Sequence, residues 1–332
     1  MTNVKHDLIA FFFSIVISVS LGAVIIPLLK KLKAGQNILG YVDNHAGKAG
    51  TTTMGGLIFA LSAFFCYFVF SQKHGVLSKV LAAVAFAYLV VGFLDDFIKI
   101  KGGKNEGLTA KQKLLFQCAI ALVISVFTYL RGYTDFFIPF VNKYYDLGIF
   151  GSILIFFVFI ATTNCVNLTD GLDGLAGGVS YVVLLCFYFL INLQVIIFQN
   201  NFVSPAECED VAFFCLMQAG ALIGFLQYNT FSASVFMGDT GSLYLGGFIA
   251  SAAIFCGNTF FIPFFGIMFV VSGISVIVQV FWFKKTGKRV FLMAPLHHHF
   301  EYKGHSESKI VFTYKLVTLL VGILCIISVL RG

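Results

Sequence analysis

The feature that most constrains this chain is a set of long apolar runs that recur along its whole length. A helix needs about 20 consecutive apolar residues to cross the hydrocarbon core of a bilayer, and residues 8–29, 147–166 and 310–330 are runs of that length. Only 11% of the 332 residues are charged, whereas a soluble domain has about 25%. We therefore expect an all-α polytopic membrane protein, because the chain has too little polar surface to be covered by water.

The hydropathy pattern predicts about ten membrane-spanning helices. The first apolar run is too long for a signal peptide and no small-residue cleavage site follows it, so we expect it to be retained. No change of composition marks a second domain, which predicts one integral-membrane domain over residues 1–332. The expected spans cover residues 8–29, 53–71, 79–97, 113–130, 147–166, 176–198, 210–227, 241–257, 260–283 and 310–330.

The distribution of basic residues predicts the orientation of these spans. Of the 22 Lys and Arg residues, 15 fall in the loops that follow the first, third and ninth expected spans. Cytoplasmic loops carry such an excess, so we expect these loops in the cytoplasm and both chain termini outside. The formal charge of +7 is spread over the loops and forms no basic domain, which argues against a nucleic-acid partner.

Five aspartates are expected on the cytoplasmic side, at span ends or in short loops. Carboxylates are costly beside lipid, so five of them at one depth favour a functional site over ordinary solvated loop charges. They are Asp95, Asp96, Asp170, Asp173 and Asp239.

Asp95 and Asp96 are expected to end the third span, just before a Lys-rich loop. Neighbours on a helix point about 100° apart, so only one of the two can point fully into a shared site. Paired acids beside a cation can hold a metal ion, position a lysine or take a proton. The pair alone is a weak motif, because adjacent acids are common at helix ends.

Two glycine-rich segments carry the other acids. Residues 164–178 read NCVNLTDGLDGLAGG, a loop that leads into a helix. Such loops present N–H groups that favour phosphate, although this one lacks the Walker pattern. Asp239 lies between Gly238 and Gly241, which expose a carboxylate at a helix start, and its hard oxygens suit Mg²⁺. Asx turns and a helix N-cap are the structural alternatives.

The long basic loop contains three successive histidines, His297, His298 and His299. Adjacent histidines cannot easily bind one zinc ion, so we interpret the run as contacting phosphate or supporting a site, with a solvated loop as the alternative. Lys48 and Lys111 are further candidate phosphate contacts, although a lone lysine in a cytoplasmic loop is more often a topological charge.

Taken together, these segments resemble the phospho-N-acetylmuramoyl-pentapeptide transferase family, within the polyprenyl-phosphate N-acetylhexosamine-1-phosphate transferase superfamily. The resemblance runs nearly end to end. The segments that carry it are TTTMGG, FLDDFIK, GLTAKQK, NLTDGLDGLA, FMGDTGS and PLHHHFE, in this order.

The resemblance implies a Mg²⁺-dependent enzyme of the bacterial cytoplasmic membrane that turns UDP-N-acetylmuramoyl-pentapeptide and undecaprenyl phosphate into lipid I and UMP. It also implies a homodimer. The catalytic residues would be Asp95, Asp96, Asp239 and His297 to His299, with Asp239 and Asn167 as metal ligands. Asp95 would orient or deprotonate the lipid phosphate. The implied substrate contacts are Lys48, Thr52, Lys111, Asn167, Asp170, Gly171, Leu172, Asp173, Asn229 and Phe236.

One position departs from the family pattern, because Thr52 replaces a proline that would stiffen the loop before the second span. Three alternatives stay open. A sister transferase for UDP-N-acetylglucosamine lacks the PLHHHFE pattern. An ion-coupled transporter would place its acids at mid-membrane and show paired broken helices. A scaffold would not need so many acids at one depth.

Overall fold

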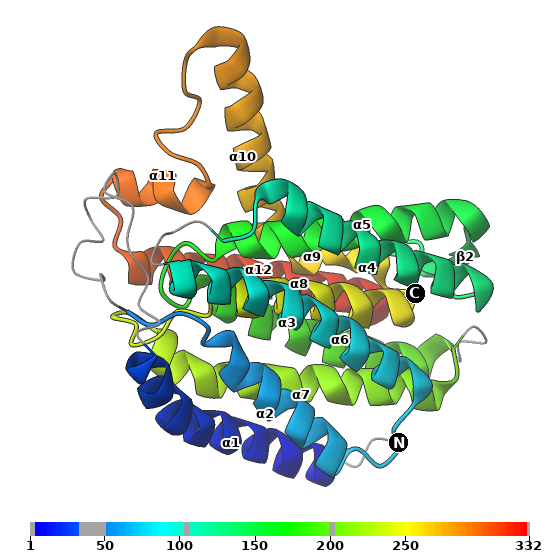
Figure 1. Cartoon of the computed structure of the whole chain (residues 1–332). Helices are drawn as coiled ribbons and strands as arrows, with labels where there is room; N and C mark the ends of the chain where they lie inside the picture. The colour runs from blue at the N-terminus through cyan, green and yellow to red at the C-terminus, as the bar shows by residue number, and fades with distance from the viewer. Residues whose placement is uncertain (1–3, 33–50, 103–106, 199–202, 331–332) are drawn as a thin grey trace.

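The computed structural model describes residues 4–32, 51–102, 107–198 and 203–330. The long helices run side by side in a bundle, and one helix, α10, projects from it (Figure 1). The elements are α1 (Val4–Lys31), α2 (Gly56–Phe70), α3 (Val76–Gly102), α4 (Ala110–Leu130), β1 (Asp135–Ile138), β2 (Lys143–Asp146), α5 (Gly148–Thr169), α6 (Leu175–Phe198), α7 (Pro205–Asn229), α8 (Gly238–Phe255), η2 (Thr259–Phe261), α9 (Ile262–Phe265), α10 (Ile267–Thr286), α11 (Leu296–Tyr302) and α12 (Glu307–Leu330).

Each expected span contains a helix, and within the described ranges eight helices are long and apolar enough to cross a membrane. The chain is therefore a mostly helical, multi-pass membrane protein. Two expected spans are not among the eight: residues 53–71 form α2, which has only 15 residues, and residues 241–257 form α8.

Helix α8 lies at the centre of the bundle, because every residue from Thr240 to Phe255 is buried. Its small residues allow close packing against α3 and α5. A Cβ added at Gly246 would lie 2.4 Å from the Cα of Thr163, and one at Gly247 would lie 2.3 Å from the ring of Tyr88. Helix α8 is thus held tightly on two sides, which fixes the position of its first turn.

The expected span at residues 260–283 is not one helix. It divides into η2, α9 and α10 around Pro263 and Gly266. Proline lacks the N–H that a continuous helix requires and fits best in a first turn, and here it is in the first turn of α9. The break lets α10 leave the bundle at a different angle from the other helices (Figure 1).

The all-α expectation missed one small antiparallel hairpin, in which β1 pairs with β2 from Asp135↔Asp146 to Ile138↔Lys143. Its sequences, DFFI and KYYD, are rich in aromatic residues that favour strands. The hairpin, the start of α1 and the end of α12 lie at one end of the bundle, and α11 lies at the other (Figure 1).

Candidate active site

The Asp95-Asp96 pair lies inside α3 and not at its end, because the helix continues to Gly102. The expected boundary was wrong, since the polar turn after the pair also becomes helical. Asp95 is fully buried and Asp96 is 2% exposed. Two carboxylates buried to this extent require partners, and each finds a different set, as the 100° between neighbouring side chains dictates.

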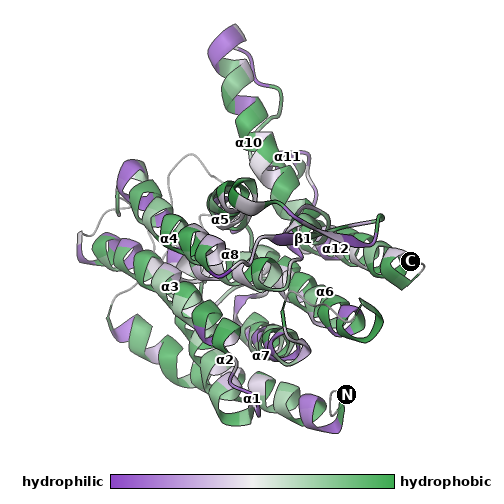
Figure 2. Ribbon diagram, turned by 90° about the vertical axis from the view of Figure 1, so that its right-hand side faces the viewer, coloured by the Kyte–Doolittle hydropathy of each residue, from purple (hydrophilic) through white to green (hydrophobic). Residues whose placement is uncertain are grey.

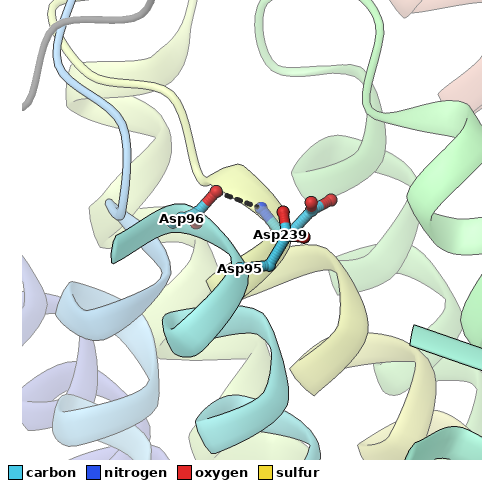
Figure 3. Close-up of side chains that lie close together, drawn as sticks. All are labelled: Asp95, Asp96 and Asp239. Atoms are coloured by element: carbon cyan, nitrogen blue, oxygen red, sulfur yellow. Dashed lines mark hydrogen bonds between the residues drawn. The ribbon is translucent and has the colours of Figure 1, made fainter. Parts of the chain in front are cut away.

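Asp96 caps the first turn of α8 from outside that helix. Its Oδ2 accepts hydrogen bonds from the backbone N of Thr240 at 2.9 Å and from Thr240 Oγ1 at 2.7 Å, and its Oδ1 accepts a longer one from the backbone N of Asp239 at 3.3 Å. The last of these is the dashed line in Figure 3. The residue that precedes α8, Met237, provides no side-chain cap, so the α3 carboxylate satisfies N–H groups that would otherwise lack partners.

The glycine before Asp239 allows this contact. Gly238 has φ +70°, and a Cβ there would lie 2.3 Å from Asp96 Oδ2 and 2.5 Å from Thr53 Oγ1. Any other residue would therefore be strained and would push the Asp96 carboxylate away. Helices α3 and α8 also touch at Gly92, where an added Cβ would lie 2.1 Å from the carbonyl oxygen of Asp239.

Asp95 and Asp239 face each other across two lysine ammonium groups. Lys99 Nζ lies 2.6 Å from Asp95 Oδ2 and 2.7 Å from Asp239 Oδ2. Lys113 Nζ, from α4, lies 3.1 Å from Asp95 Oδ1 and 2.6 Å from Asp239 Oδ2. Leu108 donates its backbone N–H to Asp95 at 2.8 Å. Three carboxylates, counting that of Asp96, thus surround two ammonium groups, and their formal charges sum to one negative charge when all three acids are ionised.

Asn167, on α5, fixes the other side of Asp239. Its amide Nδ2 donates to Asp239 Oδ1 and, at 2.8 Å, to Ser242 Oγ one turn further along α8. Asn167 and Asp239, the two expected metal ligands, are thus hydrogen-bonded to each other. This orientation turns the amide nitrogen, and not its oxygen, toward the carboxylate.

The donor set fits a hard divalent cation. Asp95, Asp96 and Asp239 each offer a carboxylate oxygen, and these oxygens lie within 4.8 Å of one another. Asp239 is the most accessible of the three, with 12% of its side chain exposed. Mg²⁺ prefers oxygen ligands and usually binds through one or two carboxylates while it keeps several waters. Asp239 can hold such an ion from its open side, while Asp96 is engaged with α8.

Most of the expected loop at residues 164–178 is helical, because α5 runs to Thr169 and α6 begins at Leu175. The glycine-rich turn that remains, residues 170–174, joins this site to the turn before α8. Asn229 accepts from the backbone N of Gly174 at 3.2 Å and donates to the carbonyl of Val235 at 2.9 Å. Asp173, which is 4% exposed, accepts from the backbone N of Ala233 at 3.0 Å. Leu172 is buried beside it. Asn229 and Asp173 thus connect two loops and set their separation.

Asp170 forms the C-cap of α5, at the start of that turn. Burial raises the pKa of its carboxyl well above the usual value, and the nearby charges of Asp239, Asp96 and Asp173 raise the pKa further. The Asp170 carboxyl is therefore harder to ionise than a carboxyl in water.

The histidine run forms α11 and packs against the same loop. A Cβ at Gly171 would lie 2.3 Å from His297 Nε2 and 3.1 Å from His298 Nε2, so only glycine lets the two segments approach this closely. His298 Nδ1 lies 2.9 Å from Glu301, and His299 Nδ1 accepts from the backbone N of Leu292 at 3.1 Å.

His297 differs from the other two histidines because it is fully buried and neither ring nitrogen has a hydrogen-bond partner among the described residues. Burial, with a smaller effect of His298, lowers its pKa to about 3. His297 is therefore a neutral imidazole at physiological pH. The three histidines thus have three different environments, which the sequence alone could not separate.

Thr52 forms an isolated parallel bridge with Val235, next to Phe236, which holds the chain before α2 against the turn before α8. Phe236 donates its backbone N–H to the carbonyl of Thr52 at 2.8 Å, and Gly55 donates to Phe236 at 2.8 Å. Thr52 is 2% exposed, and its hydroxyl lies 3.4 Å from the carbonyl of Ser234. These contacts fix the loop although the proline of the family pattern is missing.

Of the two lysines expected to contact phosphate, Lys48 lies outside the described residues, and Lys111 is exposed at the start of α4. The lysines at the acids are Lys99 and Lys113, which sequence reasoning treated only as topological charges. Lys99 follows Asp95 by four residues, a spacing that places both on one helix face, so this signal was available. Side chains two positions apart on a helix point about 200° from each other, which is why Lys113 points inward and Lys111 outward.

These features define an integral-membrane protein with a buried carboxylate–lysine site, bordered by a glycine-rich loop and a histidine-bearing helix. Residues 78–257, which carry all three site aspartates, match the model of glycosyl transferase family 4. The chain is 44% identical over 322 residues to a phospho-N-acetylmuramoyl-pentapeptide-transferase of Clostridium botulinum (strain Alaska E43 / Type E3), covering 97% of this chain and 94% of the relative.

Two further relatives have the same name. The one from Clostridium novyi (strain NT) is 41% identical, covering 95% of this chain and 93% of its own length. The one from Caldanaerobacter subterraneus subsp. tengcongensis is 41% identical, covering 96% of each. The chain therefore belongs to the phospho-N-acetylmuramoyl-pentapeptide-transferase family, within glycosyl transferase family 4, and it is an enzyme.

Proposed function

We propose that the chain transfers phospho-N-acetylmuramoyl-pentapeptide from its UDP carrier to undecaprenyl phosphate, giving lipid I and UMP in peptidoglycan synthesis. The observation that carries the proposal is the Asp95–Lys99–Lys113–Asp239 network, at one end of a membrane bundle whose full-length relatives bear that activity in their names. An acceptor with a lipid tail requires its phosphate to be activated at the membrane surface, and the network lies where α3 ends and α4 and α8 begin, which supports this placement.

The reaction joins two phosphates, so its main obstacle is charge repulsion. An oxygen of the acceptor phosphate attacks the β-phosphorus of the UDP-sugar, the bond from that phosphorus to the bridging oxygen breaks, and UMP leaves. Lys99 and Lys113 are placed to bind the incoming phosphate oxygens. Asp95, between them, orients the acceptor phosphate and takes its proton if it arrives protonated. Attack is direct, so no covalent aspartyl intermediate should accumulate with the UDP-substrate alone.

Asp239 is the proposed Mg²⁺ ligand, with Asn167 as a second contact after rotation of its amide. When bound, the ion would offset the charge on the diphosphate. Asp96 keeps the first turn of α8, and with it Asp239, in place. The proposed uridine pocket is formed or supported by Asp170, Gly171, Leu172, Asp173, Asn229 and Phe236. The proposed contacts to the phosphates and the sugar come from Lys48, Thr52, Lys111 and His297 to His299.

The remaining parts of the proposal concern the setting. The whole chain forms one domain in the bacterial cytoplasmic membrane, with about ten spans, both termini outside and the acids on the cytoplasmic side. It works as a homodimer. The positive-inside distribution of lysines supports the orientation, and the common end for the start of α1 and the end of α12 agrees with an even number of spans (Figure 1).

The test measures UMP release by the purified chain in mixed micelles with undecaprenyl phosphate. We expect release with the UDP-muramoyl-pentapeptide and not with UDP-N-acetylglucosamine, loss of release in EDTA and recovery with Mg²⁺. Asp146→Asn, in the hairpin at the far end, serves as the control and should keep wild-type rates. Release from UDP-N-acetylglucosamine would assign the chain to the sister transferases, and full activity in EDTA would remove the metal from the proposal.

A further inference from the structure

Helix α10 forms an arm that projects from the bundle. All of its buried residues lie in its first half, from Met268 to Ser275. Helix α10 crosses α5 at Gly273, where an added Cβ would lie 2.4 Å from Cys165 Sγ. Beyond Ser275 no residue of α10 is buried, and the helix stands clear of the bundle (Figure 1).

The arm has an apolar shaft and a basic tip. Its shaft exposes bulky apolar side chains that include Ile277 at 68%, Phe281 at 66% and Trp282 at 46% exposed. Its tip is hydrophilic where the shaft is hydrophobic (Figure 2). Four basic residues form this tip, Lys284, Lys285, Lys288 and Arg289, and every residue from 281 to 290 is exposed.

The tip has a defined shape. Gly287 ends α10 in the left-handed conformation with φ +69°, and the returning chain is tied to the shaft by Gln279. The side-chain oxygen of Gln279 accepts from the backbone N of Val290 at 3.1 Å and of Phe291 at 2.9 Å, and its Nε2 donates to the carbonyl of Phe291 at 3.2 Å. The four cations are therefore held together on one turn.

No acid lies near these cations along the sequence. The sequence contains no Asp or Glu between Asp239 and Glu301. Lys284 and Lys285 complement the dipole of the α10 C-terminus, but Lys288 and Arg289 lie beyond the helix. Aromatic residues followed at once by clustered basic residues are the pattern of a segment that lies at a bilayer surface, with its rings at the headgroup level.

We propose that this arm, residues 276–292, binds the anionic phospholipid headgroups of the surrounding leaflet. The apolar shaft lies among the acyl chains, and the basic tip binds acidic headgroups next to the segment that leads to α11. Each basic residue near an anionic bilayer surface adds to the electrostatic attraction. Because that attraction is electrostatic, it weakens in salt, where the screening length falls to about 3 Å at 1 M.

The chain offers a built-in probe, because Trp282 is its one tryptophan. The experiment places the full-length protein in vesicles of phosphatidylcholine with about one fifth phosphatidylglycerol, with bromine on one lipid or the other. Bromine quenches tryptophan fluorescence at short range. We expect brominated phosphatidylglycerol to quench Trp282 several-fold more than its share of the lipid predicts, and 1 M salt to remove the excess.

In the variant Lys284→Gln/Lys285→Gln/Lys288→Gln/Arg289→Gln, quenching of Trp282 should follow the bulk lipid composition of the vesicle. The control variant Lys30→Gln/Lys31→Gln, at the exposed end of α1, should behave as wild type. Quenching of the wild type that follows bulk composition would overturn the proposal, as would an excess that survives in the fourfold variant. A tryptophan quenched by neither lipid would overturn it too, by showing that protein, such as a second copy of the chain, covers the arm.

Discussion

Replacing Asp96 tests whether this residue acts by capping α8. Asp96→Ala leaves the backbone N and the hydroxyl of Thr240 without acceptors, in a residue that is fully buried. A hydrogen bond to a charged group contributes about 1.5–3 kcal/mol, so the two short bonds give about 3–6 kcal/mol. The third, at 3.3 Å, is long and adds little. Water entering the vacated space would recover part of the loss, so we expect a destabilisation of about 2–4 kcal/mol.

The measurement is thermal unfolding in detergent without substrate or divalent cation, followed with a thiol-reactive dye that reports exposure of the free cysteines. The expected fall in Tm is roughly 4–8 °C, at about 2 °C per kcal/mol for a chain of this size. The matched control is Asp146→Ala. Asp146 also accepts from a threonine hydroxyl, at 2.6 Å, and from a backbone N, at 2.8 Å, but it is exposed, so water can replace both bonds.

Turnover should fall with stability in the same variant, on the order of 100-fold, because a displacement of about 1 Å at a reacting group has that effect and Asp239 lies in the capped turn. If Asp96→Ala and Asp146→Ala melted within a degree of each other, the capping role would be refuted. Asp96 would then have to act on substrate or metal directly.

Three further substitutions test the rest of the site. Asp239→Asn should abolish UMP release and leave Tm within about 2 °C, since two lysines would still face two carboxylates; near-normal turnover would contradict the metal assignment. Lys113→Gln should lower both turnover and stability, the latter by about 1–3 kcal/mol, because only Lys99 then remains between the Asp95 and Asp239 carboxylates. Lys111→Gln should keep the wild-type Tm, because Lys111 is exposed, and should lower turnover only through the proposed phosphate contact. His297→Leu should reduce the acid sensitivity of Tm. The pKa of His297 is about 3 in the folded chain and about 6.5 in the unfolded chain, so protonation favours the unfolded chain as pH falls below about 6.5, by up to about 1.4 kcal/mol per pH unit. Equal slopes of Tm against pH in the variant and the wild type would refute this.

The helices were predictable because each has a long apolar run, and the bilayer leaves few alternatives to a helix. The break at Pro263 and Gly266 was less visible, since the residues on both sides remain apolar. The hairpin was missed because four-residue strands barely differ from a loop in hydropathy. Helix α8 was counted as one more span, although its glycines mark it as the helix that its neighbours surround.

The candidate site divides along similar lines. The sequence singled out the acids, the glycine-rich loop and the histidines, because those residues are unusual among apolar runs. The partners of each acid were not predictable, since the cap of Asp96 on α8 spans 144 residues of sequence. The phase of α4, which selects Lys113 over Lys111, needed the helix start at Ala110, which a capping box between Thr109 and Gln112 fixes.

The charge balance at Asp95, Asp96 and Asp239 explains how the lysines and the proposed metal ion can share one site. Without them, three buried carboxylates could not all remain ionised. Lys99 and Lys113 reduce their charge to one net negative, which allows the bundle to fold before any substrate binds. A bound divalent cation would change that to one net positive charge, which suits a diphosphate. The lysines would thus stabilise the acids before substrate binds, and the cation would add the charge that favours a diphosphate, so removal of Mg²⁺ should weaken nucleotide binding as well as turnover.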